Sequence, residues 1–295
     1  MTRIDSSLPC LGSRGFYRLA YSFWPADHKP SARPVLCIHG LTRNGRDFDA
    51  LAARLSATRP VLCPDMPGRG RSDWFADKAD YTYPAYLGAA AALIARLSAE
   101  NTAGEGIDYI GTSMGGIIGM LLAAQPDTPI RRLVLNDIGP FIPSAALRRI
   151  GDYVGSDPRF DGIEDLEAYL RRIHGSFGNL TDAQWRHMAQ TSAREVKAGV
   201  EAGGPDKLAL AYDPGIAPDF KGEVVDIDLW STFDRVACPV LIIRGAQSDL
   251  LLDETVEAMM RRGPKTELYE VAETGHAPAL LAEDQIARIE RFLSA

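Results

Sequence analysis

The sequence lacks any block of basic residues. Its 295 residues carry 32 Lys and Arg against 39 Asp and Glu, a formal net charge of −7, and no stretch concentrates the positive charges. Proteins that bind nucleic acids or anionic membrane surfaces usually need such a concentration. We therefore expect neither nucleic acid nor a membrane surface among the partners of this protein.

Long apolar runs and paired cysteines are also absent. No run approaches the ~20 residues that a membrane span needs, and the N-terminal segment lacks the continuous apolar core of a signal peptide. The four cysteines, at positions 10, 37, 63 and 238, form no Cys-x-x-Cys pair and no Cys/His cluster of metal-binding spacing. The sequence thus predicts a cytoplasmic protein with reduced cysteines and no metal site.

The chain does contain a recurring order of short apolar run, turn residues and helix-like segment. Apolar runs that alternate with helices indicate a mostly parallel sheet covered on both faces. An alternating run at residues 16–24 is expected to be an antiparallel edge strand. The other predicted strands span residues 35–38, 61–63, 107–110, 133–135, 240–243 and 267–271, and the predicted helices span residues 48–56, 83–98, 116–125, 255–262 and 279–293.

This order breaks between residues 139 and 233. The stretch has no convincing buried strand and instead contains helix-like pieces at residues 144–154, 163–174, 181–195 and 206–212. A helical insertion that leaves a sheet and returns to it is typical of a cap or lid. We therefore expect an α/β core domain, residues 1–138 and 234–295, with a helical cap inserted at 139–233.

Ser113 lies in the most informative motif, Gly-Thr-Ser-Met-Gly at residues 111–115. A strand-like run before the motif and a small apolar run after it predict a tight strand-to-helix turn, in which Gly111 and Gly115 avoid collisions with the facing backbone. Such a turn exposes the serine Oγ at the carboxyl edge of the sheet. The following helix directs backbone N–H groups and the positive end of its dipole toward the serine. Ser113 is therefore the predicted nucleophile.

A serine hydroxyl needs a base, and the base needs a residue that orients it. Among the five histidines, His276 alone follows the last predicted strand, in a Gly-rich loop before the final helix. Asp249 follows the preceding strand by a short loop, so the order Ser113, Asp249, His276 is the one expected of this hydrolase arrangement. Asp137, which also ends a strand, is the alternative acid.

The oxyanion of an acyl-transfer intermediate needs hydrogen-bond donors. The backbone N–H of Met114, directly after the nucleophile, is the first predicted donor. The second is the backbone N–H of Leu41, in the turn that follows the strand at residues 35–38.

Together these motifs resemble those of α/β-hydrolase-fold serine hydrolases, and the resemblance covers nearly the whole chain. It implies an α/β fold with an eight-stranded mostly parallel sheet, a cap inserted after the sixth strand, and no cofactor. Dehalogenases and epoxide hydrolases of that family carry an aspartate nucleophile, whereas this chain has Ser113. The motifs are His39-Gly40-Leu41, Asp65-Met66-Pro67-Gly68-Arg69-Gly70-Arg71-Ser72, Gly111-Thr112-Ser113-Met114-Gly115-Gly116, Arg244-Gly245 through Asp249, and Gly275-His276.

The expected reaction is hydrolysis of a small or medium carboxylic ester or lactone by a monomer or homodimer. The Ser-Met-Gly-Gly turn is shared by esterases, lactonases and C–C hydrolases, so it does not choose among them. Three alternatives stay open: C–C bond hydrolysis of a diketo acid, acyl transfer to an acceptor other than water, and a ligand receptor on a hydrolase scaffold with little turnover.

Six residues are candidates for contact with the substrate. Two of them follow the oxyanion loop, where they could meet a polar substrate group or simply be solvated. The four aromatic ones belong to the insertion, where they could line an apolar pocket or form the core of the cap. In chain order, the candidates are Arg43, Asn44, Phe141, Phe177, Trp185 and Trp230.

Overall fold

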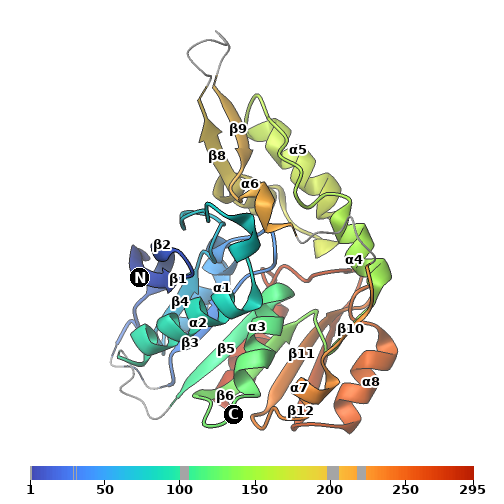
Figure 1. Ribbon diagram of the computed structural model, residues 1–295. Coiled ribbons are helices and arrows are strands. Elements are labelled where there is room, and N and C mark those ends of the chain that lie inside the picture. Colours follow the sequence, from blue (N-terminus) through green and yellow to red (C-terminus); the bar gives the residue numbers. More distant parts are fainter. Residues whose placement is uncertain (1, 29, 31, 100–105, 198–205, 218–223) are drawn as a thin grey trace.

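An eight-stranded sheet runs through the molecule in the order β1-β2-β4-β3-β5-β6-β11-β12 (Figure 1). The structure, a computed structural model, describes residues 2–28, 30, 32–99, 106–197, 206–217 and 224–295. The pairs β1–β2 and β2–β4 are antiparallel and the other pairs are parallel, which confirms the predicted fold class. The strands are β1 (Ile4–Gly12), β2 (Gly15–Trp24), β3 (Val35–Ile38), β4 (Val61–Pro64), β5 (Ile107–Thr112), β6 (Ile130–Asn136), β11 (Val240–Gly245) and β12 (Thr266–Val271).

Helices connect the strands, and several of them begin at side chains that cap their first turn. Thr82 accepts a hydrogen bond from the backbone N–H of Ala85 at 3.4 Å, and Thr181 and Gln184 form a reciprocal capping box. The α-helices are α1 (Asp49–Leu55), α2 (Tyr83–Ser98), α3 (Met114–Ala123), α4 (Ser144–Gly151), α5 (Ile163–Ile173), α6 (Asp182–Ser192), α7 (Trp230–Phe233), α8 (Asp253–Arg261) and α9 (Glu283–Ser294). Four 3-10 helices are η1 (Gly45–Phe48), η2 (Lys78–Asp80), η3 (Gly175–Phe177) and η4 (Pro214–Ile216).

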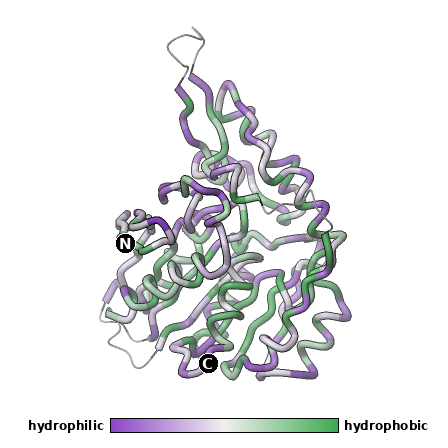
Figure 2. Tube along the Cα trace, viewed as in Figure 1, coloured by the Kyte–Doolittle hydropathy of each residue, from purple (hydrophilic) through white to green (hydrophobic). Residues whose placement is uncertain are grey.

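Side chains of the parallel strands divide between two apolar layers, because successive residues of a strand point to opposite faces. Leu36 and Ile38 of β3 pack in the layer that α2 and α3 cover, whereas Val35 and Cys37 pack in the layer beneath α1 and α9. Figure 2 shows the apolar residues concentrated along the strands and on the helices beside them. Both faces of the sheet are therefore covered, as the near-continuous apolar strands predicted.

The strand predicted at residues 16–24 exists as β2, but it does not lie at the edge of the sheet. β1 pairs with it along its whole length, from Ile4 opposite Phe23 to Gly12 opposite Gly15. The sequence of β1 is largely polar and most of its side chains are exposed. Edge strands often carry polar residues, so β1 produced no apolar run from which it could be predicted.

Between β6 and β11, no described residue joins the eight-stranded sheet. The segment contains α4 to α7 and two small antiparallel sheets, β7 (Phe141–Ile142) with β10 (Ile227–Asp228) and β8 (Ala193–Val196) with β9 (Lys207–Leu210). Side chains from α5, α6 and β9 share a separate apolar cluster, and these elements lie at the top of the view in Figure 1. The predicted helices at 144–154 and 163–174 correspond to α4 and α5.

The helix predicted at residues 206–212 is wrong, and the one at 181–195 ends at Ser192. Residues 207–210 form β9, which pairs with β8 from Ala193 opposite Leu210 to Val196 opposite Lys207. A segment this short is marginally stable as a helix, because nucleating a helix costs more free energy than its first hydrogen bonds contribute. Pairing with β8 satisfies its backbone N–H and C=O groups instead.

Candidate active site

Ser113 occupies a strained turn between β5 and α3. Its φ of 51° and ψ of −116° lie where residues with a side chain are rarely found. A Cβ on Gly111 would stand 2.4 Å from the backbone carbon of Gly115, and a Cβ on Gly115 would stand 2.0 Å from the carbonyl oxygen of Ile38. The two glycines are therefore required by close backbone contacts, and they allow β5 to turn sharply into α3 and present the serine.

Replacing Gly115 with alanine is expected to lower the free energy of unfolding by roughly 1–3 kcal/mol, the usual cost of overpacking. The added methyl group would meet backbone atoms, which cannot rotate away. Gly88→Ala in α2 is the matched control, because a Cβ there has no heavy atom within 4 Å and alanine favours a helix over glycine by up to about 1 kcal/mol. Urea denaturation of the two variants measures both effects. A Gly115→Ala protein as stable as the Gly88→Ala protein would contradict the tight turn.

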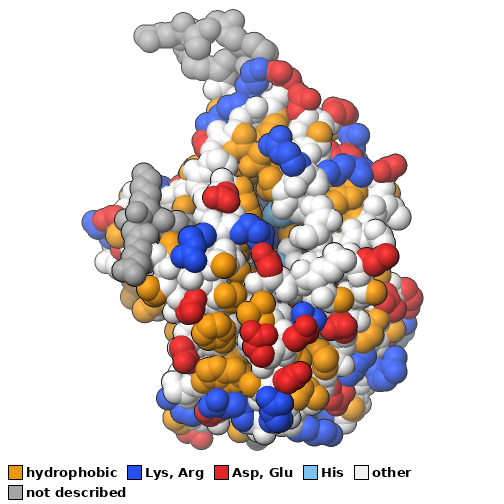
Figure 3. Space-filling model, turned by 90° about the vertical axis from the view of Figure 1, so that its right-hand side faces the viewer, with side chains coloured by type: hydrophobic (Ala, Val, Ile, Leu, Met, Phe, Trp, Pro, Cys, Tyr) orange, Lys and Arg blue, Asp and Glu red, His pale blue; other side chains and the backbone are white. Residues whose placement is uncertain are grey.

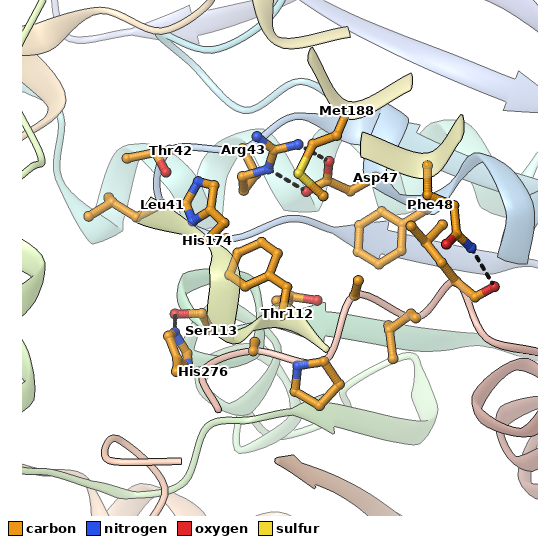
Figure 4. Close-up of a pocket in the computed structure, with 18 of the residues that line it drawn as sticks. Leu41, Thr42, Arg43, Asp47, Phe48, Thr112, Ser113, His174, Met188 and His276 are labelled. Atoms are coloured by element: carbon orange, nitrogen blue, oxygen red, sulfur yellow. Dashed lines mark hydrogen bonds and ion pairs between the residues drawn. The ribbon is translucent and has the colours of Figure 1, made fainter. Parts of the chain in front are cut away.

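Ser113, His276 and Asp137 form a continuous chain of hydrogen bonds. The Nε2 atom of His276 lies 2.9 Å from the Oγ of Ser113, and its Nδ1 atom lies 2.8 Å from Oδ2 of Asp137. Figure 4 shows the His276 ring beside the Ser113 hydroxyl. The three residues come from the ends of β5 and β6 and from the loop after β12, so the parallel sheet brings them to one edge.

Asp137 is fully buried, and three donors hold its carboxylate. Besides His276, the backbone N–H of Gly245 donates to Oδ1 at 2.8 Å and the hydroxyl of Ser248 donates to Oδ2 at 2.5 Å. These contacts immobilise the carboxylate and orient the His276 ring, with Nδ1–H toward Asp137 and Nε2 free to accept from Ser113.

The prediction that Asp249 contacts His276 is wrong. Both carboxylate oxygens of Asp249 bind Arg149 of α4, at 2.5 and 2.8 Å, and its side chain is half exposed. The neighbouring Ser248 points inward to Asp137, so Asp249 faces the surface instead. The alternative acid, Asp137, is the carboxylate at His276.

The two predicted oxyanion donors flank Ser113 with unpaired backbone N–H groups. Met114 is the first residue of α3, where N–H groups have no partner within the helix, and no described residue accepts a hydrogen bond from Leu41 N–H. Two buried side chains, Arg69 and His39, hold the loop of Leu41 in place. Arg69 Nε donates to the Leu41 carbonyl at 2.9 Å, and the buried His39 ring bonds Gly40 O at 2.7 Å and Met66 N at 2.9 Å. Burial lowers the pKa of His39 to about 3, so its imidazole ring stays neutral.

Two cavities meet at Ser113. The smaller, about 70 Å³, lies among the loops after β3 and β12, the end of α5 and residues 184–188 of α6 (Figure 4). The larger, about 820 Å³, is mostly apolar and extends along η2, α2 and α3 toward α4 and η4. A hollow in the face shown in Figure 3 contains histidine side chains between apolar ones. A molecule bound at Ser113 thus has room on both sides.

Of the six candidate substrate residues, Arg43 and Phe177 line the smaller cavity. Asn44 does not, because its side chain accepts from Arg46 N at 3.0 Å and donates to Thr191 O at 2.9 Å. Phe141, Trp185 and Trp230 line neither cavity. Trp185 belongs to the apolar cluster of α5 and α6, and Trp230 packs under Arg262, whose guanidinium lies 4.5 Å from its ring centre.

Sequence reasoning missed His174 as a residue of the site. It lies at the end of α5, where the preceding pattern indicates only a helix, and its ring lines the smaller cavity with that of Tyr153. No motif surrounds it, so no sequence signal could have placed it near Ser113.

The described ranges contain no group of three or more His, Cys, Asp or Glu side chains that could hold a metal ion. None of their helices is both long and apolar enough to cross a membrane. All four cysteines are buried and free.

Comparison with known proteins identifies the family. Residues 35–289 match the model of the alpha/beta hydrolase family. The chain is 42% identical over 293 residues to the 3-hydroxybutyrate-oligomer hydrolase of Cupriavidus necator, covering 97% of this chain and 96% of that protein. It is 28% identical over 251 residues to the 2-(acetamidomethylene)succinate hydrolase of Mesorhizobium japonicum, covering 84% and 83%.

A solved structure agrees with these matches. An alpha/beta hydrolase from Novosphingobium aromaticivorans superposes with a TM-score of 0.83 at 36% identity, covering 99% of this chain and 98% of that one. Fold, family model and full-length relatives lead to one conclusion: the chain belongs to the alpha/beta hydrolase family.

Proposed function

We propose that this protein hydrolyses a carboxylic ester through an acyl-enzyme formed at Ser113. The observation that carries the proposal is the 2.9 Å contact between Ser113 Oγ and His276 Nε2. In this proposal His276 is the general base, Asp137 orients it, and the N–H groups of Leu41 and Met114 stabilise the oxyanion.

The chemistry takes two steps. The Oγ of Ser113 attacks the ester carbonyl while His276 accepts its proton, and the tetrahedral intermediate collapses when His276 protonates the leaving alkoxide. Water then gives a proton to His276 and attacks the acyl-enzyme, and the returning proton restores the Ser113 hydroxyl as the acid leaves. Asp137 keeps the imidazole oriented and stabilises the imidazolium that forms in each step.

The proposed substrate is an ester between short hydroxy acids, such as an oligomer of 3-hydroxybutyrate. Two observations support it. The relative with that activity in its name is 42% identical along nearly the whole of both chains. The cavities on the two sides of Ser113 suit an ester with a short acyl group on one side and a longer group on the other.

The linear dimer of 3-hydroxybutyrate tests the proposal. We expect sustained cleavage to two monomers, followed by pH-stat titration of the released acid and by chromatography. Absence of turnover on this dimer and on simple ethyl esters would refute ester hydrolysis. A burst of product without turnover would favour the ligand receptor, cleavage of a diketo acid alone would favour C–C hydrolysis, and products formed with added alcohols or thiols would reveal acyl transfer.

We also propose that residues 139–233 act as a cap domain on a core of residues 1–138 and 234–295, in a reduced cytoplasmic setting. The separate apolar cluster of α5, α6 and β9, and the contribution of α4, α5 and α6 to the smaller cavity, support the cap. The four free cysteines support the reduced compartment.

A further inference from the structure

Both cavities that meet at Ser113 are mostly apolar, but they differ in size and in the side chains that line them. Arg43, His174, Gln184 and His187 contribute polar groups to the smaller cavity, whereas the larger cavity is lined mainly by isoleucine, leucine, valine and tyrosine side chains. Its volume of about 70 Å³ is less than a tenth of the 820 Å³ on the other side of Ser113. The smaller cavity therefore suits one short unit that can meet a few polar side chains.

The cationic groups of the smaller cavity already have carboxylate partners. Arg43, which is 5% exposed, donates to both oxygens of Asp47 at 2.9 and 2.6 Å, and its third hydrogen bond goes to Ser192 Oγ at 2.9 Å. Figure 4 marks the contacts with Asp47. His187 lies 3.4 Å from Asp49. A substrate carboxylate placed here would find no uncompensated positive charge, so burial would disfavour it.

His174 contributes a buried imidazole to this cavity. Its side chain is 4% exposed, stacks on Phe177 at 4.4 Å between ring centres and meets the Tyr153 ring edge-on at 6.1 Å. No side-chain hydrogen bond joins it to the described part of the chain. Burial, the charge of Arg43 and the nearby His276 hold the pKa of His174 well below its usual value. A neutral imidazole offers one N–H donor and one nitrogen acceptor.

A hydroxyl group complements a neutral imidazole. It can donate a hydrogen bond to the unprotonated ring nitrogen or accept one from the ring N–H. A buried polar group left unpaired costs free energy, and a site built to bind a hydroxyl therefore discriminates strongly against the analogue that lacks it. An unsubstituted acyl chain would leave His174 unpaired in the complex.

We propose that the smaller cavity binds a single hydroxyl-bearing acyl unit, and that the imidazole of His174 recognises its hydroxyl group. This inference rests on the proposed ester hydrolysis at Ser113. It has a consequence for an oligomer of hydroxy acids. The free hydroxyl end enters the smaller cavity, the rest of the chain with its terminal carboxylate lies on the side of the larger cavity, and one unit is released from the hydroxyl end at each turnover.

His174→Phe tests the recognition, since phenylalanine keeps a planar ring between Phe177 and Tyr153 but removes both polar nitrogens. Hydrolysis of ethyl 3-hydroxybutyrate, measured for each enantiomer, is compared with that of ethyl butyrate. We expect the wild type to prefer one hydroxy ester by about tenfold or more in kcat/KM. The variant should lose this preference, with a clearly larger fall in kcat/KM for the hydroxy ester than for ethyl butyrate. His174→Gln, which retains a donor and an acceptor, should recover part of the preference. This second variant distinguishes loss of recognition from misfolding of the His174→Phe protein.

Two results would overturn the inference. One is a wild type that shows no preference for the hydroxy esters, and the other is a His174→Phe protein that loses activity equally on both esters while His174→Gln recovers neither. These outcomes are distinct from failure of the proposed function, in which ethyl butyrate would not be hydrolysed at all or Ser113→Ala would stay active.

The direction of cleavage gives an independent readout. A linear trimer of 3-hydroxybutyrate should yield monomer and dimer first. Methylation of its hydroxyl end should block cleavage, whereas a methyl ester at its carboxyl end should be tolerated. The opposite sensitivity to the two caps would refute the assignment of the smaller cavity.

Discussion

Ser113→Ala is expected to lower kcat by about 10⁴-fold or more, because removal of a triad nucleophile leaves only binding and oxyanion stabilisation. The change deletes one oxygen, the atom that lies 2.9 Å from His276 Nε2. Initial rates on ethyl 3-hydroxybutyrate, at saturating concentration, measure the loss. Ser98→Ala, at an exposed position near the end of α2, is the matched control and should keep wild-type activity.

Loss of folding would not account for this result. Removing the Ser113 hydroxyl forfeits one hydrogen bond, which contributes about 0.5–1.5 kcal/mol to stability. Alanine can occupy the same backbone conformation as serine, and nothing is added that could clash. Urea denaturation should therefore give similar midpoints for the variant and the wild type. A Ser113→Ala protein that retains more than a few per cent of the wild-type kcat would remove Ser113 as the nucleophile.

Asp137→Asn is expected to reduce kcat by about 10⁴-fold, whereas Asp249→Asn should change it by less than about twofold. An asparagine amide facing Nδ1 of His276 donates a hydrogen bond where the carboxylate accepts one. The imidazole then carries its proton on Nε2 and cannot take the proton of Ser113. Asp249 instead forms an ion pair with Arg149 at the surface, which contributes about 0–1 kcal/mol to stability and nothing to the tautomer.

The two asparagine variants form a matched pair, with the same chemical change at two strand-end carboxylates. Both kcat and KM should be measured, because Asp137 does not line either cavity and its loss should appear in kcat rather than in KM. If the Asp249→Asn protein were inactive and the Asp137→Asn protein active, Asp249 rather than Asp137 would be the residue that orients His276. Equal and severe losses in both would show that the loop after β11 must hold its shape for catalysis.

Local sequence signals were sufficient for most of the core. Near-continuous apolar residues predict β3 and β11, because a strand buried on both faces has mostly apolar side chains. The polar β1 and the short β9 escaped prediction, since their stability comes from pairing with β2 and β8 rather than from their own composition.

The proposed nucleophile, its proposed base and the proposed oxyanion donors were predicted from local constraints. Ser113 must stand between two glycines because the backbone of Ile38 and of Gly115 leaves no room for a side chain. His276 is identified by its position after the last strand, and Leu41 and Met114 by their place in turns. Each of these inferences needs only a few adjacent residues and the order of the strands.

Two features could be identified only from the tertiary structure: the carboxylate that contacts His276, and the polar side chains that line the smaller cavity. Asp137 and Asp249 both follow strands that end at the same edge, and the direction of each side chain depends on the conformation of its loop. His174 lines the same cavity as Ser113 because the end of α5 packs near the loops after β3 and β12, and no neighbouring residue in the sequence predicts that packing. The pattern of apolar and turn residues in the sequence specifies which helices and strands form. Contacts between residues a hundred or more positions apart arise only when those elements pack together in three dimensions.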